Sequence, residues 1–122
     1  MWKKLEQQLF PVSKLPNAFE EWLWDLDDED NPAPMSRDEV QDCIRRGEFL
    51  MEMFVPEHGG WEWTREMHVA RVAYFCVHGW DTPIWVDLYE NGDIGLDGHH
   101  RATAAFYLGK TEVEAFINVF IG

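Results

Sequence analysis

The residues with the clearest chemical potential lie together in the stretch "GLDGHHRATAAFYLGK", residues 95–110. His99, His100 and Arg101 directly follow Asp97 and Gly98. Arginine binds phosphate through parallel hydrogen bonds, and histidine donates hydrogen bonds or transfers protons near neutral pH. These residue types indicate either an anion site with acid–base chemistry or a polar, solvated turn.

A helix is expected to begin directly after Gly98, because glycine allows the unusual backbone conformations needed where a strand meets a helix. The first turn of a helix has unpartnered N–H groups and the positive end of the dipole, so it attracts anions. Ala102, Ala104 and Ala105 keep this helix thin enough to lie close to a sheet. From the residues alone, a phosphate site and a structural turn capped by Asp97 remain alternatives.

A second helix is predicted by the periodicity of "REMHVARVAYFCVHG", with Thr64 as its N-cap. His68, Arg71 and His78 fall along one face of this helix. We therefore add His68 and Arg71 to the candidate ligand-binding residues. The expected buried stripe consists of Val69, Val72, Ala73, Cys76 and Val77.

The remaining pattern of the second half predicts strands. "IWVDLYENGDIGL" alternates with period two around an Asn-Gly turn, which is typical of a tight hairpin. The helix after Gly98 should end at Gly109, and "TEVEAFINVFI" should form a final strand. The fold class is therefore α+β, a small mixed sheet flanked by helices.

The first half is predicted to be a helical, acidic extension, residues 1–60, packed on a core at residues 61–122 within one compact domain. Ser36 and Glu39 form a capping box for a helix that should end at Gly47. Asn17 is expected to cap a short helix that presents Phe19, Trp22 and Leu23 on one face. This helix leads into the acidic run "DLDDEDNPAP", whereas residues 49–64 fit either a strand or a loop.

Composition limits the function classes. The net charge of −13 opposes binding to a nucleic-acid backbone, so direct DNA binding is not expected, and a basic protein is the easier partner. Cys43 and Cys76 show no disulfide or metal-binding pattern. Because no long apolar run is present, we expect a cytoplasmic protein without a membrane segment.

The run "DGHHRATAAFYLGKTEVEAFI" resembles the signature loop and helix of the ParB/sulfiredoxin superfamily, in which Asp-Gly-x-His-Arg precedes small residues, Leu-Gly and an apolar strand. The similarity extends upstream through "PIWVDLYENGDIGLDG" and "HVARVAYF", covering about half the chain. It implies a ParB/sulfiredoxin-like core whose loop holds the phosphates of a nucleoside triphosphate, often with a divalent cation such as Mg²⁺. The implied phosphate contacts are Gly98, His99, His100 and Arg101, with Asp97 closing the strand.

The departures from that family narrow the expected activity. Sulfiredoxins carry a catalytic cysteine where this chain has His99, so sulfinic acid reduction is not expected. The chain also ends before the DNA-binding domain of chromosome-partitioning ParB proteins, so centromere binding is not expected. What the resemblance still implies is nucleotide hydrolysis, phosphoryl transfer or nuclease action, with Arg101 stabilising phosphate charge and His100 relaying a proton.

Other chemistry is less well supported by the sequence. The histidines lack the spacing of a zinc site, so no dedicated metal site is predicted, although Asp87, Asp93 and Asp97 could approach Mg²⁺ beside a phosphate. A second hypothesis is a non-enzymatic protein of the kind carried by phages or plasmids, whose acidic residues 17–34 would block a basic host protein. The Trp-rich segments "EEWLWDL" and "GGWEWT" fit either core or partner surface.

Overall fold

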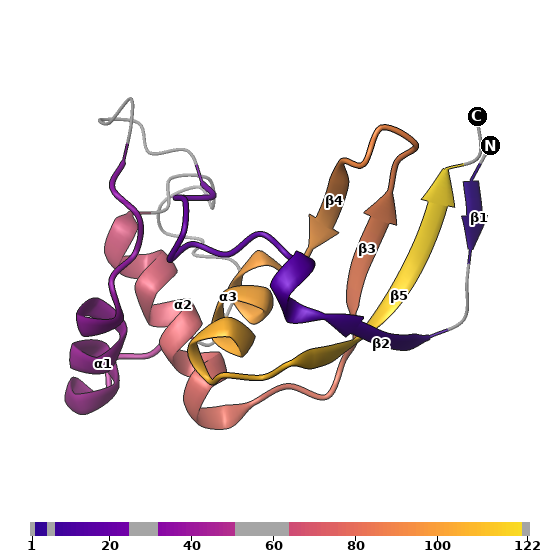
Figure 1. The fold of residues 1–122 in the computed structure, drawn as a ribbon. Coiled ribbons are helices and arrows are strands. Elements are labelled where there is room, and N and C mark those ends of the chain that lie inside the picture. Colours follow the sequence, from indigo (N-terminus) through magenta and orange to yellow (C-terminus); the bar gives the residue numbers. More distant parts are fainter. Residues whose placement is uncertain (1, 5–6, 25–31, 51–63, 121–122) are drawn as a thin grey trace.

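The computed structural model describes residues 2–4, 7–24, 32–50 and 64–120 of the chain. Within these ranges it shows an α+β fold with one mixed sheet, as the sequence predicts (Figure 1). No helix in the described part of the chain is both long and apolar enough to cross a bilayer. The elements are β1 (Trp2–Lys4), β2 (Gln8–Pro11), the 3-10 helix η1 (Val12–Lys14), α1 (Arg37–Arg46), α2 (Arg65–His78), β3 (Ile84–Leu88), β4 (Ile94–Asp97), α3 (His99–Tyr107) and β5 (Glu112–Phe120).

The long strand β5 organises the sheet. It pairs in parallel with β3, which pairs in turn with β4 in the predicted antiparallel hairpin. Two short strands from the beginning of the chain, β1 and β2, pair antiparallel with β5. These two strands were not predicted, and they place residues from both expected parts of the chain in one sheet.

The helices α1 and α2 begin and end where the local signals predict. Ser36 and Glu39 form the reciprocal capping box of α1, and Gly47 ends it with a φ of 69°. The Thr64 side chain accepts a hydrogen bond from the backbone N–H of Met67 at the start of α2. Each bond satisfies an N–H group that has no partner inside its helix.

Among the described residues, two hydrophobic clusters form the core, and α3 contributes to both. Ala102 and Ala105 pack with Ile84 and Val86 under the sheet, whereas Ala104 packs with the cluster of α1 and α2. The helix therefore lies between α2 and the sheet (Figure 1). Small side chains on both sides of α3 let these neighbours approach closely.

Some of the predicted local structure and burial is wrong. In place of a helix after Asn17 the chain makes a single turn at residues 18–20, although Asn17 Oδ1 does accept the N–H groups of Phe19 and Glu20. The helix does not continue because the Ala18 carbonyl accepts a bond from Met35 N–H instead. In α2, Val77 belongs to the predicted buried stripe but is 48% exposed.

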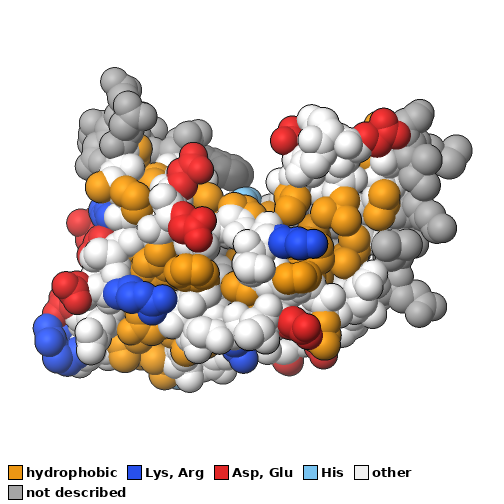
Figure 2. All heavy atoms as spheres, viewed as in Figure 1, with side chains coloured by type: hydrophobic (Ala, Val, Ile, Leu, Met, Phe, Trp, Pro, Cys, Tyr) orange, Lys and Arg blue, Asp and Glu red, His pale blue; other side chains and the backbone are white. Residues whose placement is uncertain are grey.

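The acidic run lies mainly in residues 25–31, outside the described ranges, as do residues 51–63 of the segment predicted as strand or loop. On the face drawn in Figure 2, the acidic side chains of the described residues are dispersed among apolar ones.

A buried hydrogen bond fixes the N-terminal segment to α3, because Ala18 N–H donates to Thr103 Oγ1 at 3.1 Å. We expect Thr103→Val to lower the free energy of unfolding by about 1–3 kcal/mol, since the buried N–H of Ala18 loses its acceptor. Urea denaturation measures this loss, and faster hydrogen exchange at the Ala18 amide reports its location. Thr103→Ser is the control, because it keeps the hydroxyl. It should lower the free energy of unfolding by about 1 kcal/mol for the lost methyl group, and hydrogen exchange at the Ala18 amide should stay slow. Equal exchange rates in the two variants would show that this bond does not hold the segment.

Candidate functional site

A cavity of about 340 Å³ opens at the N-terminus of α3. We call it the loop cavity. Six of the seven predicted site residues line it, and only His68 does not. Its lining residues are Trp24, Arg71, Phe75, Thr82, Asp97, Gly98, His99, His100 and Arg101.

Gly98 is the N-cap residue of α3 and forms part of the wall of the loop cavity. Its φ of 118° is a conformation that favours glycine. The alternative that Asp97 caps this helix is wrong, because the cap residue is Gly98 and no side chain caps the first turn. The first turn also contains no acidic residue. The N-terminus of α3 therefore presents backbone donors and the positive end of its dipole at the cavity.

Arg101 joins the start of α3 to the segment before β3. Its Nη1 donates to the carbonyl and hydroxyl oxygens of Thr82 at 3.0 and 2.9 Å, and to the carbonyl of Pro83 at 3.2 Å. The guanidinium thus has a structural role that the sequence did not indicate. It still forms part of the cavity wall, where its position is fixed by these bonds.

Arg71 brings a second guanidinium to the loop cavity from α2. The residue is only 8% exposed, its Nη1 donates to the Leu50 carbonyl, and its guanidinium carbon lies 4.4 Å from the centroid of the Phe75 ring. Burial lowers the pKa of Arg71; the neighbouring Tyr74 raises it, and the positive charge of Arg101 lowers it further. The two guanidinium groups therefore repel each other across this part of the structure.

His68 and His100 form a hydrogen-bonded pair, of which only His100 lines the loop cavity. The distance from His68 Nδ1 to His100 Nε2 is 2.9 Å, and the residues are 5% and 8% exposed. One ring must donate and the other accept, so the pair has two tautomeric arrangements that differ by proton positions. His68, on the predicted face of α2, therefore contacts a residue of the cavity wall, His100, but does not itself line the cavity.

Trp24 covers both rings of this pair. Its indole stacks on His68 with 4.3 Å between ring centroids and on His100 with 4.5 Å, and both ring pairs are within 15° of parallel. The Trp22 ring stands nearly perpendicular to the His68 ring, with 5.7 Å between the ring centroids. The Trp-rich segment therefore contributes core here: Trp22 is 9% exposed and Trp24 is half-buried.

Burial keeps the histidines of the site neutral. It lowers the pKa of His68 to about 4. It lowers the pKa of His100 further, and the charges of His68, Arg71 and His99 add to this effect. Burial also lowers the pKa of His99, although the Asp97 carboxylate opposes that shift. Near neutral pH the charged groups among the described lining residues are thus two guanidinium groups and the Asp97 carboxylate.

Some candidate groups do not reach the loop cavity. Asp87 accepts a bond from Asn118, and Asp93 is bonded to Asn91 in the hairpin turn, so only Asp97 of the three carboxylates lines it. No group of three or more potential metal ligands occurs among the residues that the structure describes.

The cysteines are placed away from the loop cavity. Cys43 is buried and donates to the Glu48 carbonyl, and burial raises its pKa. Burial raises the pKa of Cys76 to about 12, so both thiols stay protonated.

Three residues of the cavity wall were missed as site residues: Trp24, Phe75 and Thr82. Trp24 stood out only as part of a Trp-rich segment, and nothing in the sequence distinguishes Thr82. A comparison with protein-family models, curated proteins and solved structures finds no significant match to this chain.

Proposed function

We propose that the loop cavity binds a phosphorylated small molecule, with a nucleoside triphosphate as the first candidate. The observation that carries this proposal is the placement of Arg71 and Arg101 in one cavity with the first turn of α3. The cavity volume of about 340 Å³ lies within the usual range for small-molecule sites. The resemblance to the ParB/sulfiredoxin loop supports a nucleotide over other phosphorylated ligands.

The electrostatics favour an anionic ligand. The rest of the protein is strongly acidic, yet this cavity combines two guanidinium groups with the positive end of a helix. An anion placed between Arg71 and Arg101 offsets their mutual repulsion, and in a half-buried site charge interactions are stronger than in water. The phosphate would therefore meet backbone donors on one side and arginine on the other.

The proposal assigns different roles to the neighbouring residues. His99 donates a hydrogen bond, and His100 passes a proton to or from His68 through their direct contact if hydrolysis follows binding. Asp97 is the carboxylate of the described lining that would face Mg²⁺ held by the phosphates. Since Mg²⁺ commonly binds through one or two carboxylates and substrate phosphates, this donor set fits a phosphate-borne ion.

Isothermal titration with ATP, CTP, GTP, UTP and pyrophosphate, each with and without Mg²⁺, tests the proposal. We expect one of these probes to bind, and Arg101→Ala to weaken it by about tenfold to a hundredfold through the loss of a charged contact. The matched control is Arg45→Ala, which removes an exposed guanidinium bonded to Asp42 in α1. Thermal unfolding of each variant shows whether it is folded.

Two results would contradict the proposed phosphate site. Absence of binding by every probe to the folded wild type, or equal affinity of the Arg101→Ala and Arg45→Ala variants, would overturn the phosphate site. If a nucleotide does bind, measuring phosphate release during incubation distinguishes a hydrolase from a protein that only binds it.

A further inference from the structure

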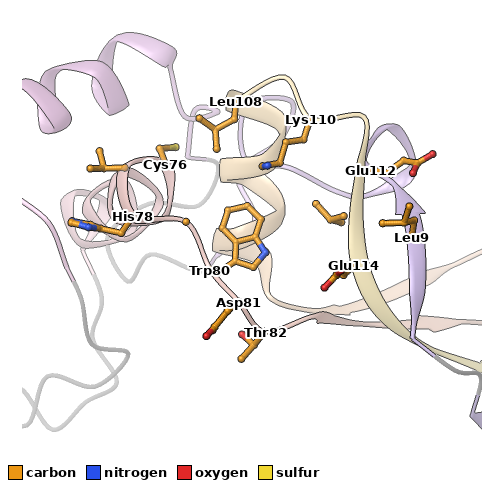
Figure 3. A pocket seen from close by; sticks show the side chains of 13 residues that line it. Leu9, Cys76, His78, Trp80, Asp81, Thr82, Leu108, Lys110, Glu112 and Glu114 are labelled. Carbon is orange, nitrogen blue, oxygen red and sulfur yellow. The ribbon is translucent and has the colours of Figure 1, made fainter.

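A second hollow, of about 570 Å³, lies between residues 79–83 and the beginning of β5. We call it the linker groove, because residues 79–83 link α2 to β3. In Figure 3, Trp80 stands in the middle of the groove, with the end of α2 on one side and Leu9, Glu112 and Glu114 on the other. Only Thr82 is shared with the lining of the loop cavity.

The wall of the linker groove exposes apolar side chains. Leu9, Val77 and Leu108 are 59%, 48% and 44% exposed, and all three line it. They make up three of the five exposed large hydrophobic side chains in the described part of the chain. Single exposed apolar residues are ordinary, but their gathering around one concave site is typical of an interaction surface.

The charges of the groove are mainly negative. Three carboxylates, Asp81, Glu112 and Glu114, face one lysine, Lys110. The Lys110 ammonium lies 6.0 Å from the centroid of the Trp80 ring. The groove therefore favours a ligand that is both cationic and apolar.

A strand edge also borders the groove. Residues Glu112–Glu114 of β5 pair with β2 on one side, where Leu9 is opposite Glu114. On the other side the β3–β5 ladder begins only at Ile84 and Ala115. Within the described ranges no backbone hydrogen bond joins residues 79–83 to residues 112–114. An uncovered strand edge is a template for an added extended segment.

We propose that the linker groove binds an extended segment of a partner protein in which lysine or arginine alternates with aliphatic residues. The segment adds beside Glu112–Glu114 through backbone hydrogen bonds. Its basic side chains meet Asp81, Glu112 and Glu114, and its aliphatic side chains cover Val77 and Leu108. This binding does not depend on the phosphate site.

The probe is the synthetic peptide acetyl-Gly-Lys-Val-Lys-Val-Lys-Gly-amide, and its counterpart has glutamate in place of each lysine. Each is titrated into the isotopically labelled full chain and followed by two-dimensional NMR. We expect the lysine peptide to shift the amides of residues 79–82 and 108–114, and the glutamate peptide to leave them unchanged. Because the contact is charge-dependent, the affinity should fall as salt is raised.

Matched variants locate the site. Asp81→Lys with Glu112→Lys should weaken the lysine peptide by about tenfold. Glu20→Lys with Glu21→Lys changes the net charge equally at exposed positions outside the groove lining and should leave the affinity nearly unchanged. Shifts confined to other residues, equal loss in both double variants, or no binding of the lysine peptide would overturn the proposal.

Discussion

Replacing Gly98 with alanine is expected to lower the free energy of unfolding by about 3 kcal/mol or more, a large fraction of the stability of a small domain. Two costs combine. A φ of 118° strains any residue with a side chain, and a Cβ at this position would lie 2.8 Å from Ile84 Cγ2 and 3.0 Å from Arg101 Nη2. Ile84 is fully buried, so the chain cannot move it aside easily. Urea denaturation measures the loss.

Gly92→Ala separates these two costs. Gly92 in the hairpin turn also has a positive φ, 91°, but nothing lies within 4 Å of the position its Cβ would take. This variant should lose only about 1–2 kcal/mol, from backbone strain alone. Equal losses at Gly98 and Gly92 would show that contact with Ile84 and Arg101 adds nothing. The difference between them measures how tightly the loop closes against β3.

Acidification is expected to destabilise the protein through the His68–His100 pair. Both rings have a pKa in the folded protein below their ordinary value of 6.5, chiefly because they are buried. The unfolded chain therefore takes up more protons as the pH falls. The stabilisation is fully present above about pH 6.5 and is lost below it, by about 1.4 kcal/mol per pH unit for each ring, down to the lowered folded-state pKa. For His68 that limit is about pH 4.

The measurement is the free energy of unfolding in urea at a series of pH values from about 7 to about 5. The double variant His68→Gln with His100→Gln removes both titrating rings, so the difference in slope from the wild type isolates them from the many carboxylates. His78→Gln, at an exposed position of the same helix, is the matched control. A double variant with the same slope as the wild type would contradict the proposed role of the buried pair.

The elements that could be predicted are those specified by neighbouring residues. The Ser36 and Thr64 caps, the Asn91-Gly92 turn and the break at Gly98 each depend on bonds or dihedral angles within a few positions. Because these signals act between neighbouring residues, the elements that they predict are also present in the folded protein. The limits of α1 and α2, the hairpin and α3 follow from them.

The N-terminal segment could not be predicted because its partners are distant in sequence. β2 pairs with residues 112–115, and its few residues show no alternation that would identify a strand alone. Asn17 bonds to the next N–H groups as a helix cap does, but Ala18 is held by Thr103 and Met35. Tertiary hydrogen bonds therefore override a correct local signal.

The sequence predicted six of the residues that line the loop cavity but not the contacts among them. Spacing on α2 placed His68 and Arg71 on one face, and the loop motif supplied residues 97–101. That His68 bonds to His100, that Trp24 covers both rings and that Arg101 bonds to Thr82 depend on the packing of α2, α3 and the linker. None of these pairings has a signature in the sequence.

The arrangement of the sheet also determines when the chain can fold during its synthesis. β1 and β2 are made first, yet their only strand partner in the described structure is β5, more than a hundred residues later in the sequence. The apolar side chains of Phe10, Val12 and Leu15 therefore stay exposed until Val113 and Ala115 have left the ribosome. Such long-range pairing slows folding and lengthens exposure to aggregation. The helices α1 and α2 can form early, but the sheet closes only after β5 has been made.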